Sequence, residues 1–252
     1  MVGHRGGIAT SVEISRSYRR DHRPSSQFVE PQQVLDVIRV AGVRRWVLMG
    51  LYGYVGYLTE PRATQAVDVL VDFDELDLAI DAIVARWPAL QVDRQVVVVR
   101  FLDPGEIAIT GEMKQVIDLM LPDDDCYHEI LQHAHRVDPP TGDIIPTLEA
   151  ACASKFAALI SPNRQFIKKQ QDAVDLRRLF VPNQCSIDRF ELERLGELVY
   201  PGGGHEILEF LDLAIEEKPF PTRQLASTLD GSAITTNTKL TTNSLPPVVH
   251  RL

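Results

Sequence analysis

The segment Ala66–Asp72, AVDVLVD, constrains the fold of this chain more than any other stretch of its 252 residues. Valines alternate with other residues, and a period of two is typical of a strand that has one face in a core. The three valines lie on one face of the strand, which leaves Asp68 on the opposite face. The pattern therefore predicts a strand that buries valines on one side and presents a carboxylate on the other.

The residues before this strand predict the elements that lead into it. Pro31–Ala41 has apolar residues at helical spacing, with proline in the first turn and Gly42 directly after the last turn. Trp46–Met49 is a short apolar run that ends at Gly50, which is typical of a buried strand entering a glycine turn. A further helix is expected to begin within Tyr52–Leu58. The predicted order is helix, strand, glycine turn, helix and strand.

The residues after Asp72 predict a helix, three more strands and then a helical half. The helix is expected over Phe73–Trp87, because its apolar residues recur at helical spacing and its first turn is acidic. An antiparallel meander is expected from three apolar or alternating runs: Gln95–Leu102, Glu106–Thr110 and Gln115–Leu121. Helices are expected at Tyr127–Val137, Thr147–Ile160, Arg164–Phe180, Arg189–Tyr200 and Glu206–Glu217. We therefore expect an α+β fold: a mixed or antiparallel sheet with flanking helices, followed by a helical C-terminal half.

Four regions are expected along the chain. Residues 1–27 carry five arginines against two acids and show no apolar periodicity, which is typical of a disordered basic tail. Residues 28–125 form the expected α/β core, and residues 126–221 form the helical region. Residues 222–252 are rich in threonine and asparagine, which predicts a second disordered tail.

Charge and composition exclude several classes of protein. A formal net charge of -9 is incompatible with a surface built to neutralise duplex phosphates throughout. The charge is unevenly spread, because residues 66–81 hold six acids and no base, whereas residues 164–178 hold five bases and two acids. No apolar run approaches the roughly 20 residues of a membrane helix, and the N-terminus lacks the apolar region of a secretory signal. The three cysteines have no metal or redox spacing. We expect a cytoplasmic protein with reduced thiols and no membrane partner.

The stretch Val47–Asp72 resembles the nucleotidyltransferase core of the DNA polymerase β superfamily, and most closely its AbiEii-toxin-like branch. Members of that branch typically show a glycine turn followed by Arg-x-Thr-x-Asp-x-Asp. Gly50 matches the turn glycine, while Arg62, Thr64 and Asp68 match the arginine, the threonine and the second aspartate. The resemblance extends over residues 31–180.

The resemblance continues beyond the first strand pair. Asp118 stands in a hydrophobic-Asp-Leu-hydrophobic context that matches the third metal carboxylate of such proteins. Lys155 lies in a helix where the branch places a lysine, and Arg164 follows where it places an arginine. Asp172 and Asp175 match the acids of a Lys-Asp-x-x-Asp element.

The resemblance implies a set of roles and a function. Asp68 and Asp118 would be the catalytic carboxylates and would hold magnesium or manganese. The nucleotide would be bound by Gly50, Arg62, Thr64, Lys155 and Arg164, with Asp172 and Asp175 in support. The implied activity is binding of a magnesium–nucleoside triphosphate and transfer of a nucleotidyl group to a hydroxyl of an RNA, a protein or a small molecule.

Two departures from the branch fall on this site. Ala66 replaces the first aspartate of the Asp-x-Asp pair, and Leu51 replaces the second residue of the turn. Asp72 shares the face of Asp68 but lies about 13 Å away at roughly 3.3 Å per residue, which is too far to share an ion with Mg–O bonds of about 2.1 Å. Binding of one metal is retained, whereas catalysis with two metals is in question. The alternative is a catalytically inactive nucleotidyltransferase fold that acts as a binding or regulatory module; the acceptor and the oligomeric state stay open.

Some of these residues also have purely structural interpretations. Lys155 could be an ordinary helix lysine with a buried stem and an exposed ammonium. Asp172 and Asp175 could pair with neighbouring bases on the helix surface rather than orient Lys155. The histidines around Cys126 match no established zinc spacing.

Overall fold

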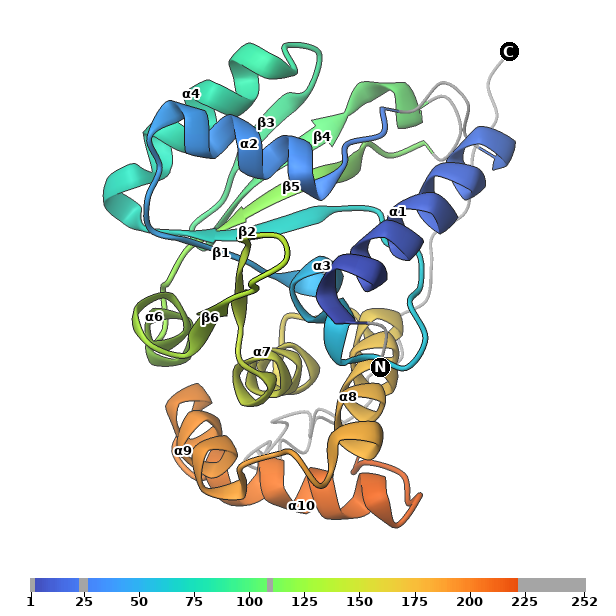
Figure 1. Cartoon of the computed structure of the whole chain (residues 1–252), viewed down its shortest axis with the longest axis vertical. Coiled ribbons are helices and arrows are strands. Elements are labelled where there is room, and N and C mark those ends of the chain that lie inside the picture. The colour runs from blue at the N-terminus through green and yellow to red at the C-terminus, as the bar shows by residue number, and fades with distance from the viewer. Residues whose placement is uncertain (1–2, 23–26, 108–110, 222–252) are drawn as a thin grey trace, which may run out of the picture. The chain divides into compact units, whose positions relative to one another are not determined.

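A five-stranded mixed sheet lies at the centre of the fold (Figure 1). The computed structural model describes residues 3–22, 27–107 and 111–221. In spatial order the strands are β1 (Trp46–Leu48), β2 (Val67–Val71), β5 (Lys114–Met120), β4 (Val98–Asp103) and β3 (Gln91–Arg94). Strands β2 and β5 are parallel, and the other neighbours pair antiparallel. A small second sheet pairs β6 (His135–Val137) with β7 (Ile144–Pro146).

Helices lie on both faces of the five-stranded sheet (Figure 1). The α-helices are α1 (Gly3–His22), α2 (Pro31–Ala41), α3 (Gly50–Tyr54), α4 (Leu76–Arg86), α6 (Asp125–Gln132), α7 (Leu148–Ile160), α8 (Phe166–Asn183), α9 (Arg189–Val199) and α10 (Gly203–Ile215). Short 3-10 turns lie at η1 (Val55–Tyr57), η2 (Phe73–Glu75) and η3 (Pro104–Glu106). The α2 helix shows why the sequence specifies such boundaries: Pro31 opens it, Glu30 and Gln33 form a capping box, and Gly42 ends it at a φ of 94°.

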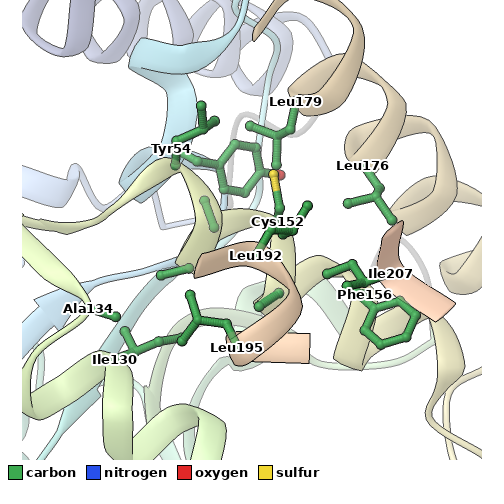
Figure 2. Close-up of a cluster of buried hydrophobic side chains, with 14 of the residues drawn as sticks. Tyr54, Ile130, Ala134, Cys152, Phe156, Leu176, Leu179, Leu192, Leu195 and Ile207 are labelled. Atoms are coloured by element: carbon green, nitrogen blue, oxygen red, sulfur yellow. The ribbon is translucent and has the colours of Figure 1, made fainter. Parts of the chain in front are cut away.

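The alternation of β2 separates two hydrophobic cores. Val67, Val69 and Val71 pack with α2 and α4 on one face of the sheet. Leu70 points to the other face and belongs to the core formed with helices α6 to α10. Figure 2 shows part of this second core, where Tyr54 of α3 lies among apolar side chains of the C-terminal helices. Asp68 shares the face of Leu70, so the second core borders the carboxylate.

The expected fold class is confirmed: the protein is α+β, with a mixed sheet, flanking helices and a largely helical C-terminal half. Residues 1–221 cluster as one compact unit, and the predicted core and helical regions share the second hydrophobic core. The predicted tail at 222–252 lies outside the described residues. Within the described ranges, every helix is too short or too polar to cross a bilayer.

Several strand predictions are wrong in detail. The expected strand Glu106–Thr110 begins in the turn η3 instead, and residues 108–110 lie outside the described part of the chain. The meander therefore consists of β3, β4 and β5, and its last strand continues the sheet through a parallel pairing with β2. The expected helix Tyr127–Val137 ends at Gln132, because residues 135–137 pair as β6 with β7.

The prediction of a disordered N-terminal tail is also wrong, because Gly3–His22 forms the helix α1. The buried side of α1 carries mainly small or polar residues, namely His4, Gly7, Ser11, Val12, Ser15 and Arg19. Gly7 allows close packing on Val55, whose side chain would lie 3.0 Å from a Cβ at this position. Polar contacts fix both ends: the His4 and Asp143 side chains lie 3.4 Å apart and fully buried, while Arg19 donates to the backbone carbonyls of Gln27 and Gln65.

Candidate functional site

Asp68 and Asp118 are brought side by side by the parallel pairing of β2 and β5. The two residues are direct Cα partners in the strand register, so their side chains leave the same face of the sheet. Asp118 is 8% exposed and Asp68 is partly buried. The Oδ1 atom of Asp118 is buried without a hydrogen-bond partner. The two predicted metal carboxylates are therefore neighbours, and one of their oxygens is left for a ligand.

Burial and mutual repulsion weaken the acidity of this pair. The pKa of Asp118 is raised to about 7, first by burial and then by the negative charge of Asp68, against the opposing effect of Arg100. Burial also raises the pKa of Asp68, although Lys155 and Arg164 act in the opposite direction. A bound cation would relieve this repulsion and favour the ionised form of both acids.

Gly50 lies directly against Asp68. Its φ is +57°, and a Cβ built on it would lie 1.8 Å from the Oδ2 atom of Asp68. Any side chain at this position would clash with the carboxylate, in a left-handed conformation that already favours glycine. The backbone N–H of Met49 donates to the carbonyl of Asp68 at 2.8 Å, which ties the turn to β2. The turn glycine identified in the sequence therefore packs on the site.

Ala66 and Leu51, the two residues that depart from the family pattern, supply no metal or phosphate ligand in the structure. Ala66 is 8% exposed and directly precedes β2, two residues before Asp68, so a methyl group stands where a second carboxylate would face the same side. Leu51 is 3% exposed and belongs to the second hydrophobic core. Neither residue offers an oxygen to a ligand.

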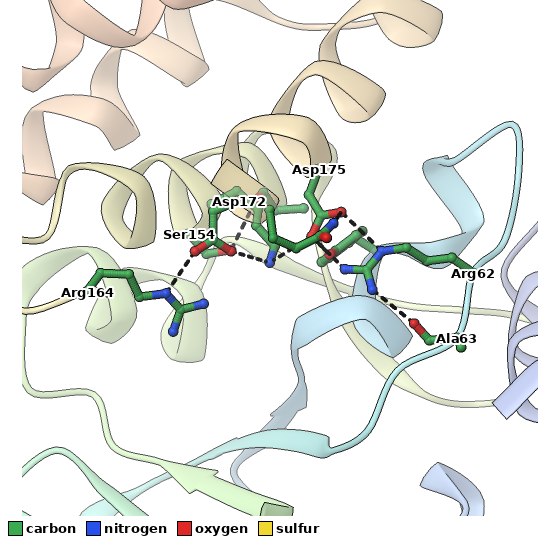
Figure 3. Close-up of polar contacts among 10 residues, drawn as sticks. Arg62, Ala63, Ser154, Arg164, Asp172 and Asp175 are labelled. Carbon is green, nitrogen blue, oxygen red and sulfur yellow. Dashed lines mark hydrogen bonds and ion pairs between the residues drawn. The ribbon is translucent and has the colours of Figure 1, made fainter. Parts of the chain in front are cut away.

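A buried ion network lies beside the carboxylate pair, and Asp175 forms one half of it (Figure 3). Arg62 donates to both oxygens of Asp175, through Nε at 3.1 Å and Nη2 at 2.7 Å. The hydroxyl of Tyr54 donates to the same carboxylate at 2.9 Å, and Gln171 donates at 3.1 Å. The pKa of Asp175 is lowered despite its burial, because Lys155 and Arg62 stabilise the carboxylate. This side chain connects the Arg62 loop to helix α8.

Asp172 forms the other half of the network (Figure 3). Lys155 Nζ lies 3.0 Å from one oxygen of Asp172 and 3.2 Å from Asp175, and Arg164 Nε donates to the other oxygen of Asp172 at 2.8 Å. Lys155 also lies over the ring of Tyr54, 5.2 Å from its centroid. Burial alone would lower the pKa of Lys155, but the surrounding acids and Tyr54 raise it, so the ammonium stays charged.

The geometry decides between the interpretations that the sequence left open for these helix residues. Asp172 and Asp175 are each 1% exposed and hold Lys155, rather than pairing with bases on the surface of α8. The ammonium of Lys155 is held by carboxylates and is not a freely exposed group, since its side chain is 14% exposed. Arg62, Lys155 and Arg164 therefore bring three positive charges to two carboxylates, which leaves one net positive charge beside Asp68.

The N-terminal helix α1 fixes the backbone of Thr64. Its backbone N–H donates to the hydroxyl of Ser15 at 3.1 Å, and Arg19 binds the carbonyl of the next residue, Gln65. The loop that carries Arg62 and Thr64 is thus fixed between α1 and the buried network.

Two further residues of this region, Tyr54 and Arg100, are not predicted from the sequence. Tyr54 lies in the short α3 helix, and burial raises its pKa to about 12, so its hydroxyl keeps its proton and donates to Asp175. Arg100 is the Cα partner of Asp118 on β4. It had one signal in the sequence, because it is the single charged residue in the run Val96–Leu102.

The donors present at the carboxylate pair suit one magnesium ion better than two. Magnesium is commonly held by one or two protein carboxylates with water completing its shell. Within residues 3–22, 27–107 and 111–221, no three His, Cys, Asp or Glu side chains gather closely enough to hold a metal. Glu129, which lies among the histidines around Cys126, pairs with Arg194 at 2.7 Å.

Two surface hollows lie away from the carboxylates. One is lined by α9 and α10, including Arg189 and Asp212, and the other by α1 and α2, including Arg16 and Glu30. Neither contains Asp68 or Asp118, so the site is defined by its side-chain chemistry and strand register.

Comparison of the chain with known proteins found similarity at the level of structure. No protein-family model matches the chain, and no curated protein matches it. Among solved structures, the chain is similar to an antigenic nucleotidyltransferase-like protein from Paracoccidioides brasiliensis, with 14% sequence identity and a TM-score of 0.39. The match covers 76% of this chain and 95% of that chain.

Proposed function

We propose that this chain is a nucleotidyltransferase-like protein that binds a nucleoside triphosphate together with one magnesium ion. The observation that carries the proposal is the register pairing of Asp68 with Asp118, which sets two carboxylates side by side with an unpartnered buried oxygen. Asp68 and Asp118 would hold the magnesium ion, which would supply positive charge to neutralise the phosphates.

The surroundings of the pair support a phosphate ligand. The backbone of Gly50 lies directly against Asp68, and any side chain at this position would collide with the Asp68 carboxylate. A phosphate can therefore come close to the carboxylate only because this residue is glycine. The buried network adds one net positive charge, and Arg164 is the most exposed of its three cations, with 40% of its side chain accessible. Its Nε donates to Asp172, whereas its terminal amino groups make no hydrogen bond to another described residue. Arg164 is therefore the network cation best placed to meet a triphosphate, while Arg62 and Lys155 act through the acids that they hold.

Nucleotidyl transfer would need an acceptor hydroxyl whose oxygen attacks the α-phosphorus while pyrophosphate leaves. In such chemistry the attacking oxygen is activated by a second divalent ion. Ala66 offers no ligand for that ion. Transfer to an RNA, a protein or a small-molecule hydroxyl is the first function to test, and a cytoplasmic toxin-like role would follow only from it.

A second candidate is a binding or regulatory module without catalysis. It is favoured by one observation, namely that the described residues hold a pair of site carboxylates and no third one. Both candidates share the nucleotide site and differ in whether a bond is made.

Label transfer separates them. The protein is incubated with each α-labelled nucleoside triphosphate, magnesium or manganese, and total RNA or protein, beside the variants Asp68→Ala and Ala66→Asp. Label transfer that Asp68→Ala abolishes establishes the enzyme. Saturable nucleotide binding without transfer establishes the binding module, and transfer gained by Ala66→Asp would identify the missing carboxylate as its cause. Absence of nucleotide binding in the wild-type protein would contradict the proposal as a whole.

A further inference from the structure

Arg100 extends the carboxylate pair into a row across three strands. Asp68 on β2 is the register partner of Asp118 on β5, and Asp118 is the register partner of Arg100 on β4. Directly paired residues on neighbouring strands point to the same face of a sheet. Gly50 packs on the Asp68 end of this row. The row therefore has the backbone of Gly50 at one end, two carboxylates in the middle and the guanidinium of Arg100 at the other end.

Arg100 has no partner of its own in the described part of the chain. Its Nε atom is buried and makes no hydrogen bond. Asp93, its register partner on the edge strand β3, accepts a hydrogen bond from Gln95 instead. The other strongly placed cations of the region are already engaged, since Lys155 and Arg164 both bind Asp172. Arg100 is thus a partly buried cation that makes no hydrogen bond or close ion pair with an anion among the described residues.

Two unsatisfied groups therefore stand next to each other on one face of the sheet: the Nε of Arg100 and the Oδ1 of Asp118. A buried donor or acceptor without a partner costs free energy, so native proteins keep few such groups, and a bound ion, a water molecule or a catalytic role is a common reason for one. A cation alone would satisfy Asp118 but would be repelled by Arg100. A phosphate alone would satisfy Arg100 but would be repelled by both acids. A metal-bound phosphate satisfies both ends of the row.

We propose that Arg100 is a phosphate-binding residue, which takes an anionic oxygen of a metal-bound polyphosphate on the β4 side of the two acids. The inference rests on the proposed function and adds a contact to it, on the side of the row opposite Gly50. Guanidinium suits this position because its planar fork can donate two parallel hydrogen bonds to one phosphate group.

The test is calorimetric titration of the full chain at pH 8, first with magnesium alone and then with magnesium tripolyphosphate. Tripolyphosphate is the probe because it has neither base nor sugar, so its affinity reports the phosphate contacts. The variant is Arg100→Gln. The matched control is Lys168→Gln, since Lys168 is exposed and also acts electrostatically on both acids.

Arg100→Gln is expected to weaken tripolyphosphate binding about 10- to 100-fold, the usual range for a charge-assisted hydrogen bond. The same change is expected to tighten binding of magnesium alone, because it removes a positive charge beside the ion. Opposite shifts of the two affinities would not arise from a purely structural role, which would weaken both. Lys168→Gln is expected to weaken tripolyphosphate binding less than about 3-fold, as for an exposed charge screened by water.

The outcomes separate the two proposals. Unchanged tripolyphosphate affinity in Arg100→Gln, or a loss equal to that in Lys168→Gln, overturns the role of Arg100 and leaves the proposed function intact. Failure of the wild-type protein to bind magnesium tripolyphosphate overturns both. If Arg100→Gln does not fold, Arg100→Lys takes its place, and it is expected to show an intermediate loss because it keeps the charge without the forked donors.

Discussion

Asp68 on β2 and Asp118 on β5 occupy the same register position of two parallel strands, so two carboxylates leave one face of the sheet side by side. The hydrogen-bonded pairing of the two strands holds them there. Burial and then the negative charge of Asp68 raise the pKa of Asp118, and one of its buried oxygens has no hydrogen-bond partner. A buried acid pair of this kind costs folding free energy, which a bound ligand would offset.

The first prediction concerns pH. The pKa of Asp118 rises from 3.8 to about 7 on folding, so the folded state binds more protons than the unfolded state between these values. The stabilisation by the protonated carboxyl is complete below the unfolded pKa and is lost as pH rises through the folded pKa. In the presence of a chelator, the free energy of unfolding should fall between pH 4 and 7 by on the order of 2–4 kcal/mol from this group. Urea unfolding of wild type and Asp118→Asn measures it; an equally steep fall in the variant would contradict the assignment.

The second prediction concerns Gly50. Gly50→Ala adds a methyl group that must displace the Asp68 carboxylate, in addition to about 1–2 kcal/mol of left-handed backbone strain. Gly42→Ala is the matched control, since Gly42 also has a positive φ but has nothing within 4 Å of a built Cβ. Both variants should lose stability, but only Gly50→Ala should also lose affinity for magnesium. Equal magnesium affinities in the two variants would show that Gly50 does not border the ion.

The third prediction concerns the buried network. Asp175→Asn removes a carboxylate that holds Arg62 and Lys155, and should cost about 3–5 kcal/mol of unfolding free energy, as for other broken buried pairs. Asp212→Asn breaks the exposed pair with Arg189 and should cost no more than about 1 kcal/mol. Chemical denaturation compares them. Similar costs would mean that the network is as solvated as the surface pair.

The fourth prediction concerns the N-terminal helix. Arg19→Ala removes two hydrogen bonds from a buried guanidinium to backbone carbonyls and should cost about 1.5–3 kcal/mol, the usual contribution of a hydrogen bond to a charged group. Arg20→Ala, one residue along the same helix but exposed, should stay within about 0.5 kcal/mol of wild type. If both substitutions were neutral, α1 would not be docked in solution and the expectation of a basic tail would be restored.

The sequence predicts the parts of this structure that depend on local periodicity. The valine alternation of β2 predicts which face carries Asp68, and Pro31 with Gly42 predicts both ends of α2. The β3 strand was missed because its sequence QVDR has exposed or partly buried side chains and therefore no hydrophobic alternation. The α1 helix was missed for a related reason: its buried side is made of small and polar residues, so no apolar stripe marks it.

Some residues of the candidate site could likewise be predicted from local sequence, whereas their contacts could not. Asp68, Gly50 and Asp118 could be picked out from their sequence contexts, but their closeness depends on a parallel pairing between distant strands. The partners of Asp172 and Asp175 could not be predicted, because acids at this spacing can equally bind bases on their own helix. Only the packing of α7 against α8 decides that they hold Lys155.

The most direct test of the central claim is the number of metal ions bound with the nucleotide. Equilibrium dialysis with manganese and a non-hydrolysable nucleoside triphosphate gives the manganese and nucleotide bound per chain, for wild type and for Asp68→Asn and Asp118→Asn. We expect one manganese ion and one nucleotide bound per chain in the wild-type protein, and a loss of both in each variant. Binding that survives both substitutions, or no saturable binding in the wild-type protein, would contradict it.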